Sequence, residues 1–130
     1  MMMNALSPHQ KTVVSPERKA TALALFAALE PFVNEQPNMT LANFMAFLRV
    51  AGDEGEGVAH YADKAQVYKT VMSRHLLDLG ERDRYGGPGL NWITQARRND
   101  DLRVNRSWVT HKGAAMLDTA RRAMTLLVRH

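Results

Sequence analysis

Two helical patterns joined by a very short connection, in residues 58–79, constrain the fold more than any other feature of this 130-residue sequence. Apolar residues at helical spacing predict a short helix over residues 58–65 and a longer one over residues 69–79. A tight turn lies at Gln66, and the small Ala62 allows the two helices to cross closely. We therefore predict a helix-turn-helix, in which the second helix projects from the molecule.

The two faces of the second helix differ in chemistry. We expect Met72 and Leu76 to anchor it in the core, with Val67 of the turn also buried. The outward face and the residue before it carry Tyr68, Lys69, Thr70, Ser73 and Arg74. Arginine and lysine suit guanine edges or phosphates, and serine and threonine suit either partner. This face is predicted to bind DNA, and a solvated face of an ordinary helical hairpin is the alternative.

A β-hairpin is predicted downstream of these helices. Residues 90–95 and 104–109 have the β-branched and aromatic content of strands, around a polar connection at residues 96–103. The hairpin is basic, with Arg97, Arg98, Arg103 and Arg106. Guanidinium groups on such a loop can reach phosphates or a narrow minor groove. We therefore expect a wing over about residues 96–106, and an arginine-rich hairpin kept for solubility is the alternative.

Three further helices surround this unit. Ser15 and Pro16 are a typical helix start, and we expect that helix to end near Glu30 because Pro31 follows. Thr40 and Thr110 are predicted to cap two others. Residues 52–57 are expected to form a loop and residues 1–14 a flexible segment, followed by one domain over residues 15–130. The expected fold is mainly α (α+β): four helices, a two-stranded hairpin and a last helix.

Charge is distributed unevenly along the chain. Residues 1–57 carry four basic and six acidic side chains, whereas residues 58–130 carry thirteen basic and seven acidic ones. A basic segment beside an acidic one is typical of proteins that bind polyanions. The absence of cysteine excludes disulfides, thiolate metal sites and cysteine nucleophiles. No stretch is apolar enough to span a bilayer and no secretory signal is evident, so a cytoplasmic protein is expected.

Catalytic and metal-binding patterns are weak. His60, His75 and His111 do not share metal-site spacing, and His75 is expected to be packed among apolar residues. The glycine-rich stretch at residues 86–89 lacks the lysine and hydroxyl of a nucleotide-binding loop. We therefore expect no metal, no cofactor and no enzymatic activity.

The residues of the helix-turn-helix and hairpin resemble the MarR family of winged-helix regulators. Residues 109–113, with the pattern Val-Thr-x-x-Gly, are similar to the LT-x-x-G helix start that follows the wing in that family. Asp101 with Arg103 is similar to the acid–arginine pair that braces the family's wing. The resemblance covers about residues 40–118. Gln66 replaces the usual glycine and Tyr68 the usual short capping residue, which predicts a distorted turn or a shifted start of the second helix.

The resemblance also implies function. It implies a bacterial homodimer formed by the terminal helices, binding double-stranded DNA as a repressor at a palindromic operator with half-sites about 34 Å apart. It further implies a small aromatic effector near Phe26, Phe44, Phe47 and Trp92, although such residues more often form a plain core. Two alternatives stay open: a phage or plasmid DNA-binding control or replication factor, and a winged-helix module that binds protein instead of DNA.

Overall fold

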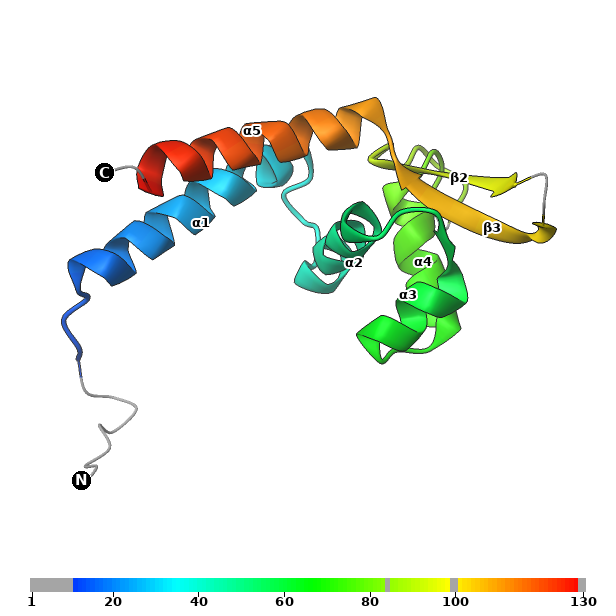
Figure 1. The fold of residues 1–130 in the computed structure, drawn as a ribbon, viewed down its shortest axis with the longest axis horizontal. Coiled ribbons are helices and arrows are strands. Elements are labelled where there is room, and N and C mark those ends of the chain that lie inside the picture. The colour runs from blue at the N-terminus through cyan, green and yellow to red at the C-terminus, as the bar shows by residue number, and fades with distance from the viewer. Residues whose placement is uncertain (1–10, 84, 99–100, 129–130) are drawn as a thin grey trace, which may run out of the picture.

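The chain consists of a globular lobe and a projecting helical arm (Figure 1). The computed structural model describes residues 11–83, 85–98 and 101–128. The arm pairs α1 with α5, and the lobe holds the other three helices and the sheet. The elements are α1 (Pro16–Glu35), α2 (Leu41–Gly52), β1 (Glu56–Gly57), α3 (Val58–Ala65), α4 (Lys69–Leu79), β2 (Ile93–Arg98), β3 (Asp101–Val109) and α5 (His111–Val128). The predicted winged helix-turn-helix fold is confirmed, with corrections to its sheet and first helix.

The sheet has three antiparallel strands in the order β1-β3-β2, where two strands were predicted. Residues 52–57 are not all loop, because Glu56 pairs with Ser107 and Gly57 with Arg106. A two-residue strand has no periodicity, so the sequence carries no signal for it. The predicted start of β2 at residue 90 was also wrong. The chain turns at Asn91, whose φ is 59°, and the ladder begins at Ile93.

Helix α1 continues through Pro31, so its predicted end at Glu30 was wrong. Its last turn closes through the Gln36 N–H, which donates to the Phe32 carbonyl at 3.0 Å. Phe32 is buried, and its ring centroid lies 4.8 Å from that of Phe44 and 5.3 Å from that of Trp92. Burying this ring offsets the hydrogen bond that a proline removes from a helix.

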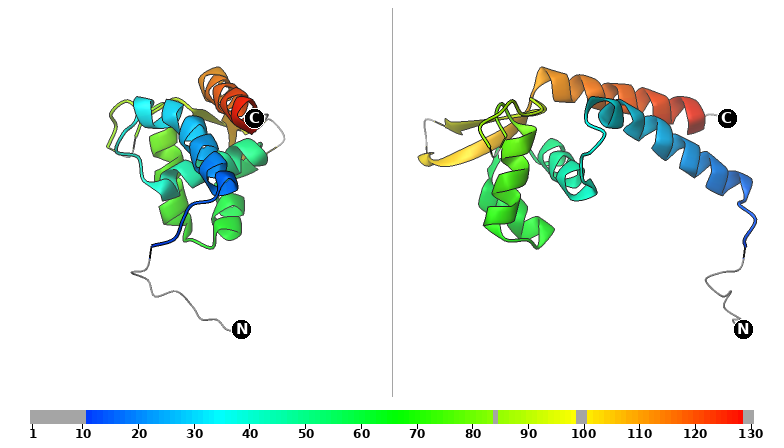
Figure 2. Two further views of the ribbon diagram at one scale, coloured as in Figure 1. Left: turned by 90° about the vertical axis from the view of Figure 1, so that its left-hand side faces the viewer. Right: turned by 180° about the vertical axis from the view of Figure 1, so that it is seen from behind.

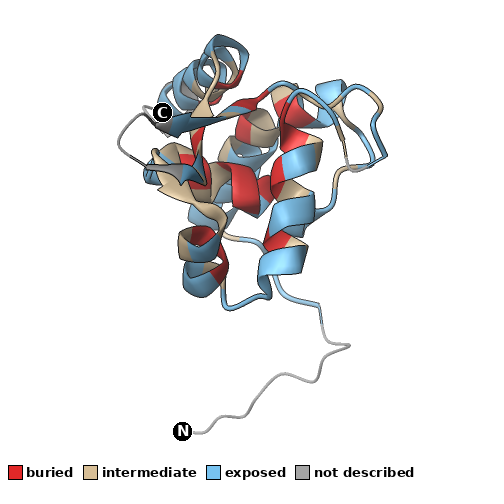
Figure 3. Cartoon of the chain, turned by 90° about the vertical axis from the view of Figure 1, so that its right-hand side faces the viewer, coloured by how far each residue is buried: buried red, intermediate tan, exposed pale blue. Residues whose placement is uncertain are grey.

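An aromatic cluster of Phe32, Phe44, Phe47 and Trp92 forms the centre of the lobe, where the buried residues gather (Figure 3). Gly113 brings α5 against this cluster. A Cβ at Gly113 would collide with the Trp92 carbonyl and lie 3.2 Å from the Phe47 ring. The Thr110 hydroxyl accepts from the Gly113 N–H at 3.1 Å and so caps α5, as predicted.

The arm leaves much of its apolar surface uncovered. Helices α1 and α5 lie side by side along its length in each view (Figures 1 and 2). Lys112 and Glu35 form an ion pair at its base. Exposed apolar residues on the two helices include Leu23, Leu25, Phe26, Val33 and Met124. Among the described helices, none is long and apolar enough to cross a membrane.

Candidate nucleic-acid interface

The turn between α3 and α4 keeps regular geometry despite its unusual sequence. Gln66 adopts the left-handed conformation with φ 58° and ψ 44°, the role that glycine usually fills. Helix α4 then begins at Lys69, because the Tyr68 carbonyl accepts from the N–H groups of Val71 and Met72 at 3.1 Å each. The expected distortion of this turn is therefore absent, and the predicted start of α4 is confirmed.

Val67 was predicted to be buried and is 39% exposed. The crossing between the two helices is filled by Ala62 and Met72 instead, each 2% exposed. Leu76 anchors α4 as predicted, with no exposed surface. Val67 follows the left-handed residue and stays at the edge of this contact, which sequence periodicity could not show.

The outward face of α4 gathers the predicted polar side chains. Lys69, Thr70, Ser73 and Arg74 are all exposed. Together with Val58 at the start of α3 they line one shallow groove of about 410 Å³. Cationic and hydroxyl groups on one projecting helix can bind phosphates and the major-groove edges of bases. This face is the first half of the candidate interface.

The wing projects from the lobe at the end opposite the arm (Figure 1). Arg97 and Arg103 are exposed on its two strands. Arg106 is half-buried, and its guanidinium donates to the Gly55 carbonyl at 2.8 Å, so it also fastens β3 to the loop before β1. The side chains of Arg98 and Asp101 lie outside the described residues. The pairing of Asp101 with Arg103 therefore stays a prediction.

An acidic loop that the sequence did not single out joins the helix-turn-helix to the wing. Glu54 accepts from the Val109 N–H at 2.8 Å, and Asp53 lies 2.6 Å from the His60 Nε2. The buried Tyr61 hydroxyl donates to the Asp53 carbonyl at 2.6 Å and accepts from the Glu56 N–H at 3.3 Å. Burial raises the pKa of Tyr61, and the neighbouring carboxylates raise it further. These contacts hold α3 against β3.

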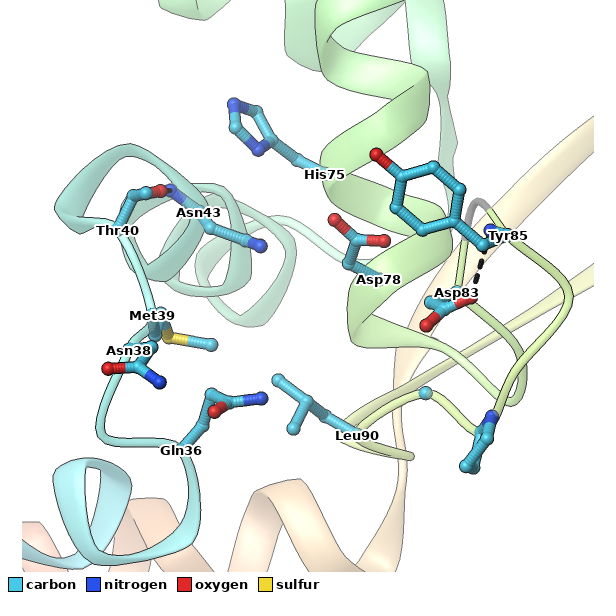
Figure 4. A pocket seen from close by; sticks show the side chains of 12 residues that line it. Gln36, Asn38, Met39, Thr40, Asn43, His75, Asp78, Asp83, Tyr85 and Leu90 are labelled. Atoms are coloured by element: carbon cyan, nitrogen blue, oxygen red, sulfur yellow. Dashed lines mark hydrogen bonds between the residues drawn. The ribbon is translucent and has the colours of Figure 1, made fainter.

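A second hollow lies on another side of α4 (Figure 4). This pocket of about 630 Å³ separates the α1–α2 connection from α4 and the loop that follows it. Asp83 shapes the loop by accepting from the Tyr85 and Gly87 N–H groups at 2.9 Å each. His75 and Asp78 of α4 line the pocket, and the described lining residues include no lysine or arginine. The pocket is polar and locally acidic.

The aromatic residues predicted to surround an effector do not share a cavity. Phe44, Phe47 and Trp92 pack within the core, whereas Phe26 is 66% exposed on the arm. The core interpretation therefore holds for those three. Among the described residues, no group of three or more histidine, aspartate or glutamate side chains is placed to hold a metal ion.

Comparisons with known proteins identify the fold. No protein-family model matches the sequence, and no curated protein sequence matches it. Among solved structures, FabT of Streptococcus pneumoniae in complex with DNA has a TM-score of 0.56 at 16% identity, covering 87% of this chain and 76% of FabT. A mutant MarR from E. coli complexed with operator DNA has a TM-score of 0.57 at 16% identity, covering 87% and 71%. A transcriptional regulator from Thermotoga maritima reaches 0.61 at 12% identity, covering 87% and 72%. The chain thus has the winged-helix fold of MarR-family regulators.

Proposed function

We propose that this chain, with the winged-helix fold of those regulators, binds double-stranded DNA sequence-specifically and regulates transcription. The observation that carries the proposal is the groove along α4, where Lys69, Thr70, Ser73 and Arg74 share one exposed face. Helix α4 enters the major groove, and the arginines of the wing contact phosphates or the adjacent minor groove. The two DNA complexes among structures of this fold support the proposal.

The regulator acts as a homodimer joined through α1 and α5. Leu23, Leu25 and Phe26 of α1 leave an apolar surface exposed, which a second copy would cover. Because a two-fold dimer presents two copies of α4, its binding site is a palindrome with half-sites about one turn of DNA apart. Occupying such an operator blocks transcription, so the proposed role is that of a repressor.

Selection from a random pool of double-stranded DNA, followed by sequencing, tests this function. Wild type is compared with Arg74→Ala at two salt concentrations, and Arg18→Ala on the arm serves as a control for lost positive charge. We expect an enriched palindrome for wild type and the control that Arg74→Ala loses, with affinity falling as salt rises. Salt-sensitive binding without a motif would point to an architectural protein. No binding would favour a protein-interaction module. Enrichment of phage or plasmid control sites would favour the mobile-element alternative.

We also propose that a small effector binds the polar pocket in Figure 4. His75 and Asp78 belong to α4, and Gln36 is the residue that ends α1, so one ligand would contact both parts of the molecule. Asp78 and Asp83 disfavour an aromatic acid, which makes a neutral phenol the better candidate. Calorimetry with a panel of phenols and aromatic acids tests this, with Asp78→Asn as the pocket variant. Absence of heat and of any change in operator affinity would contradict it.

A further inference from the structure

The N-terminal end of α4 carries an apolar patch that is not part of the polar outward face described above. Tyr68 is 82% exposed, Val67 is 39% exposed, and Val71 lies one turn further along and is half-buried. We call Val67, Tyr68 and Val71 the apolar corner. They line an open hollow of about 660 Å³ beside α3, together with Ala62, Asp63 and Gln66. The hollow lies at the N-terminal end of α4. In a helix-turn-helix this end of the second helix contacts base edges in the major groove of DNA.

Local stability does not account for Tyr68. The residue occupies the N-cap of α4, where a short side chain with an oxygen would accept a hydrogen bond from the first turn. Tyr68 makes no such bond, and only its backbone carbonyl holds the first turn. The side chain thus forgoes a cap and leaves a large aromatic surface in water. A binding role explains this placement better than a role in folding.

The chemistry of the corner indicates what it binds. Among the groups that base pairs present in the major groove, the C5-methyl group of a pyrimidine is the apolar one. Asp63 lines the same hollow, and its negative charge disfavours a phosphate there. Lys69 and Thr70 follow immediately and can bind the neighbouring backbone and base edges. A base edge that carries a methyl group is therefore the partner that fits.

We propose that the apolar corner recognises a pyrimidine C5-methyl group in the major groove, and that Tyr68 is the specificity-determining residue for it. This inference rests on the proposed DNA binding. Thymine and 5-methylcytosine both carry this group, and the corner would contact either one. Each copy of the chain would bind one such methyl group, in its own half-site.

Base replacement in the selected operator tests the inference and separates the two sources. Each thymine is replaced in turn by deoxyuridine, which removes the methyl group and keeps the base pair, and affinity is measured by fluorescence anisotropy. We expect a loss of about fourfold at one thymine in each half-site, the effect of burying one methyl group. In a parallel series each cytosine is replaced by 5-methylcytosine. A similar gain at one position, without a thymine effect, would identify methylated cytosine as the source.

Variants at Tyr68 assign the effect to the corner. Tyr68→Ser supplies a favourable N-cap, so the protein is expected to fold, and its affinity should become insensitive to the methyl group. Tyr68→Phe keeps the ring and should keep the sensitivity. Specific, salt-dependent binding with no change above twofold at any replaced base, or unchanged sensitivity in Tyr68→Ser, would overturn this inference alone. Failure of the wild type to bind any DNA would overturn the proposed function with it.

Discussion

The lobe and the arm differ in how far their apolar residues are buried. Phe47 and Trp92 of the lobe have no exposed surface, whereas Leu25 and Phe26 of the arm are more than half exposed. The lobe is formed by α2, α3, α4 and the sheet, with the base of the arm packed on it, whereas along most of the arm the described residues of α1 and α5 contact mainly each other. The lobe therefore completes its core within one chain, whereas the arm leaves apolar side chains uncovered, which is why we proposed that a second copy covers them. The following changes test that contrast.

The largest effect is expected in the lobe. Phe47→Ala removes a ring packed 5.3 Å from Trp92, centroid to centroid, and leaves a cavity in the core. The free energy of unfolding should fall by about 4 kcal/mol, measured by urea denaturation. Leu41→Ala on the same helix is the control, and its exposed side chain should change stability by less than about 0.5 kcal/mol. Equal losses in the two variants would contradict a self-contained core.

Self-association should respond to the arm instead. Phe26→Ser removes an apolar side chain that two copies would each bury in a dimer, so we expect the dimer Kd to rise roughly a hundredfold by sedimentation analysis. Tyr85→Ser, at an even more exposed aromatic residue on the lobe, is the control and should leave the Kd unchanged. If Phe26→Ser does not alter self-association, another partner covers the arm.

Features that depend on contacts within a few residues were predictable from the sequence, whereas features that depend on contacts between distant residues were not. The helix starts at Ser15, Thr40 and Thr110 were predictable because a capping side chain bonds within its own first turn. The pairing of β1 with β3 was not, because it joins residues about 50 positions apart with no periodic signal. The extension of α1 past Pro31 likewise depends on where Phe32 packs.

The candidate site shows the same division. The polar face of α4 follows from helical spacing alone, and the structure places those residues in one groove. The contact of Arg106 with the Gly55 carbonyl spans 51 positions and could not be inferred from the wing sequence. Exposure of Val67 was missed because its apolar side chain resembles a core residue, although it lies beside the exposed Tyr68.

The stability of the lobe should depend on pH through Tyr61. The pKa of Tyr61 in the folded protein is raised above its usual value of about 10, so the neutral phenol is favoured by folding. The resulting stability is present below pH 10 and is lost as pH rises through the folded pKa. Tyr61→Phe should lower stability at neutral pH by about 1 kcal/mol and weaken the decline above pH 10, measured by denaturation across pH. Tyr68→Phe, at an exposed phenol, should retain the wild-type decline.

The smallest effect is expected at the turn between α3 and α4. Gln66→Gly relieves the left-handed conformation but adds chain entropy to the unfolded state, so a net gain of about 0.5 kcal/mol is expected. Differential scanning calorimetry should show a slightly higher Tm. Gln66→Ala keeps the backbone constraint and should show no gain. A loss of stability in the glycine variant would mean that the Gln66 side chain contributes to the turn.

The distance between the arm and α4 has a genetic consequence. In a homodimer of the proposed kind, a chain with Arg74→Ala would keep an intact α1 and α5 and would still pair with wild-type copies. When both are made in one cell in equal amounts, half of the wild-type chains would be trapped in mixed dimers with a single working half. Such an allele would be dominant negative, whereas Phe26→Ser, which is expected to pair much more weakly, would be recessive.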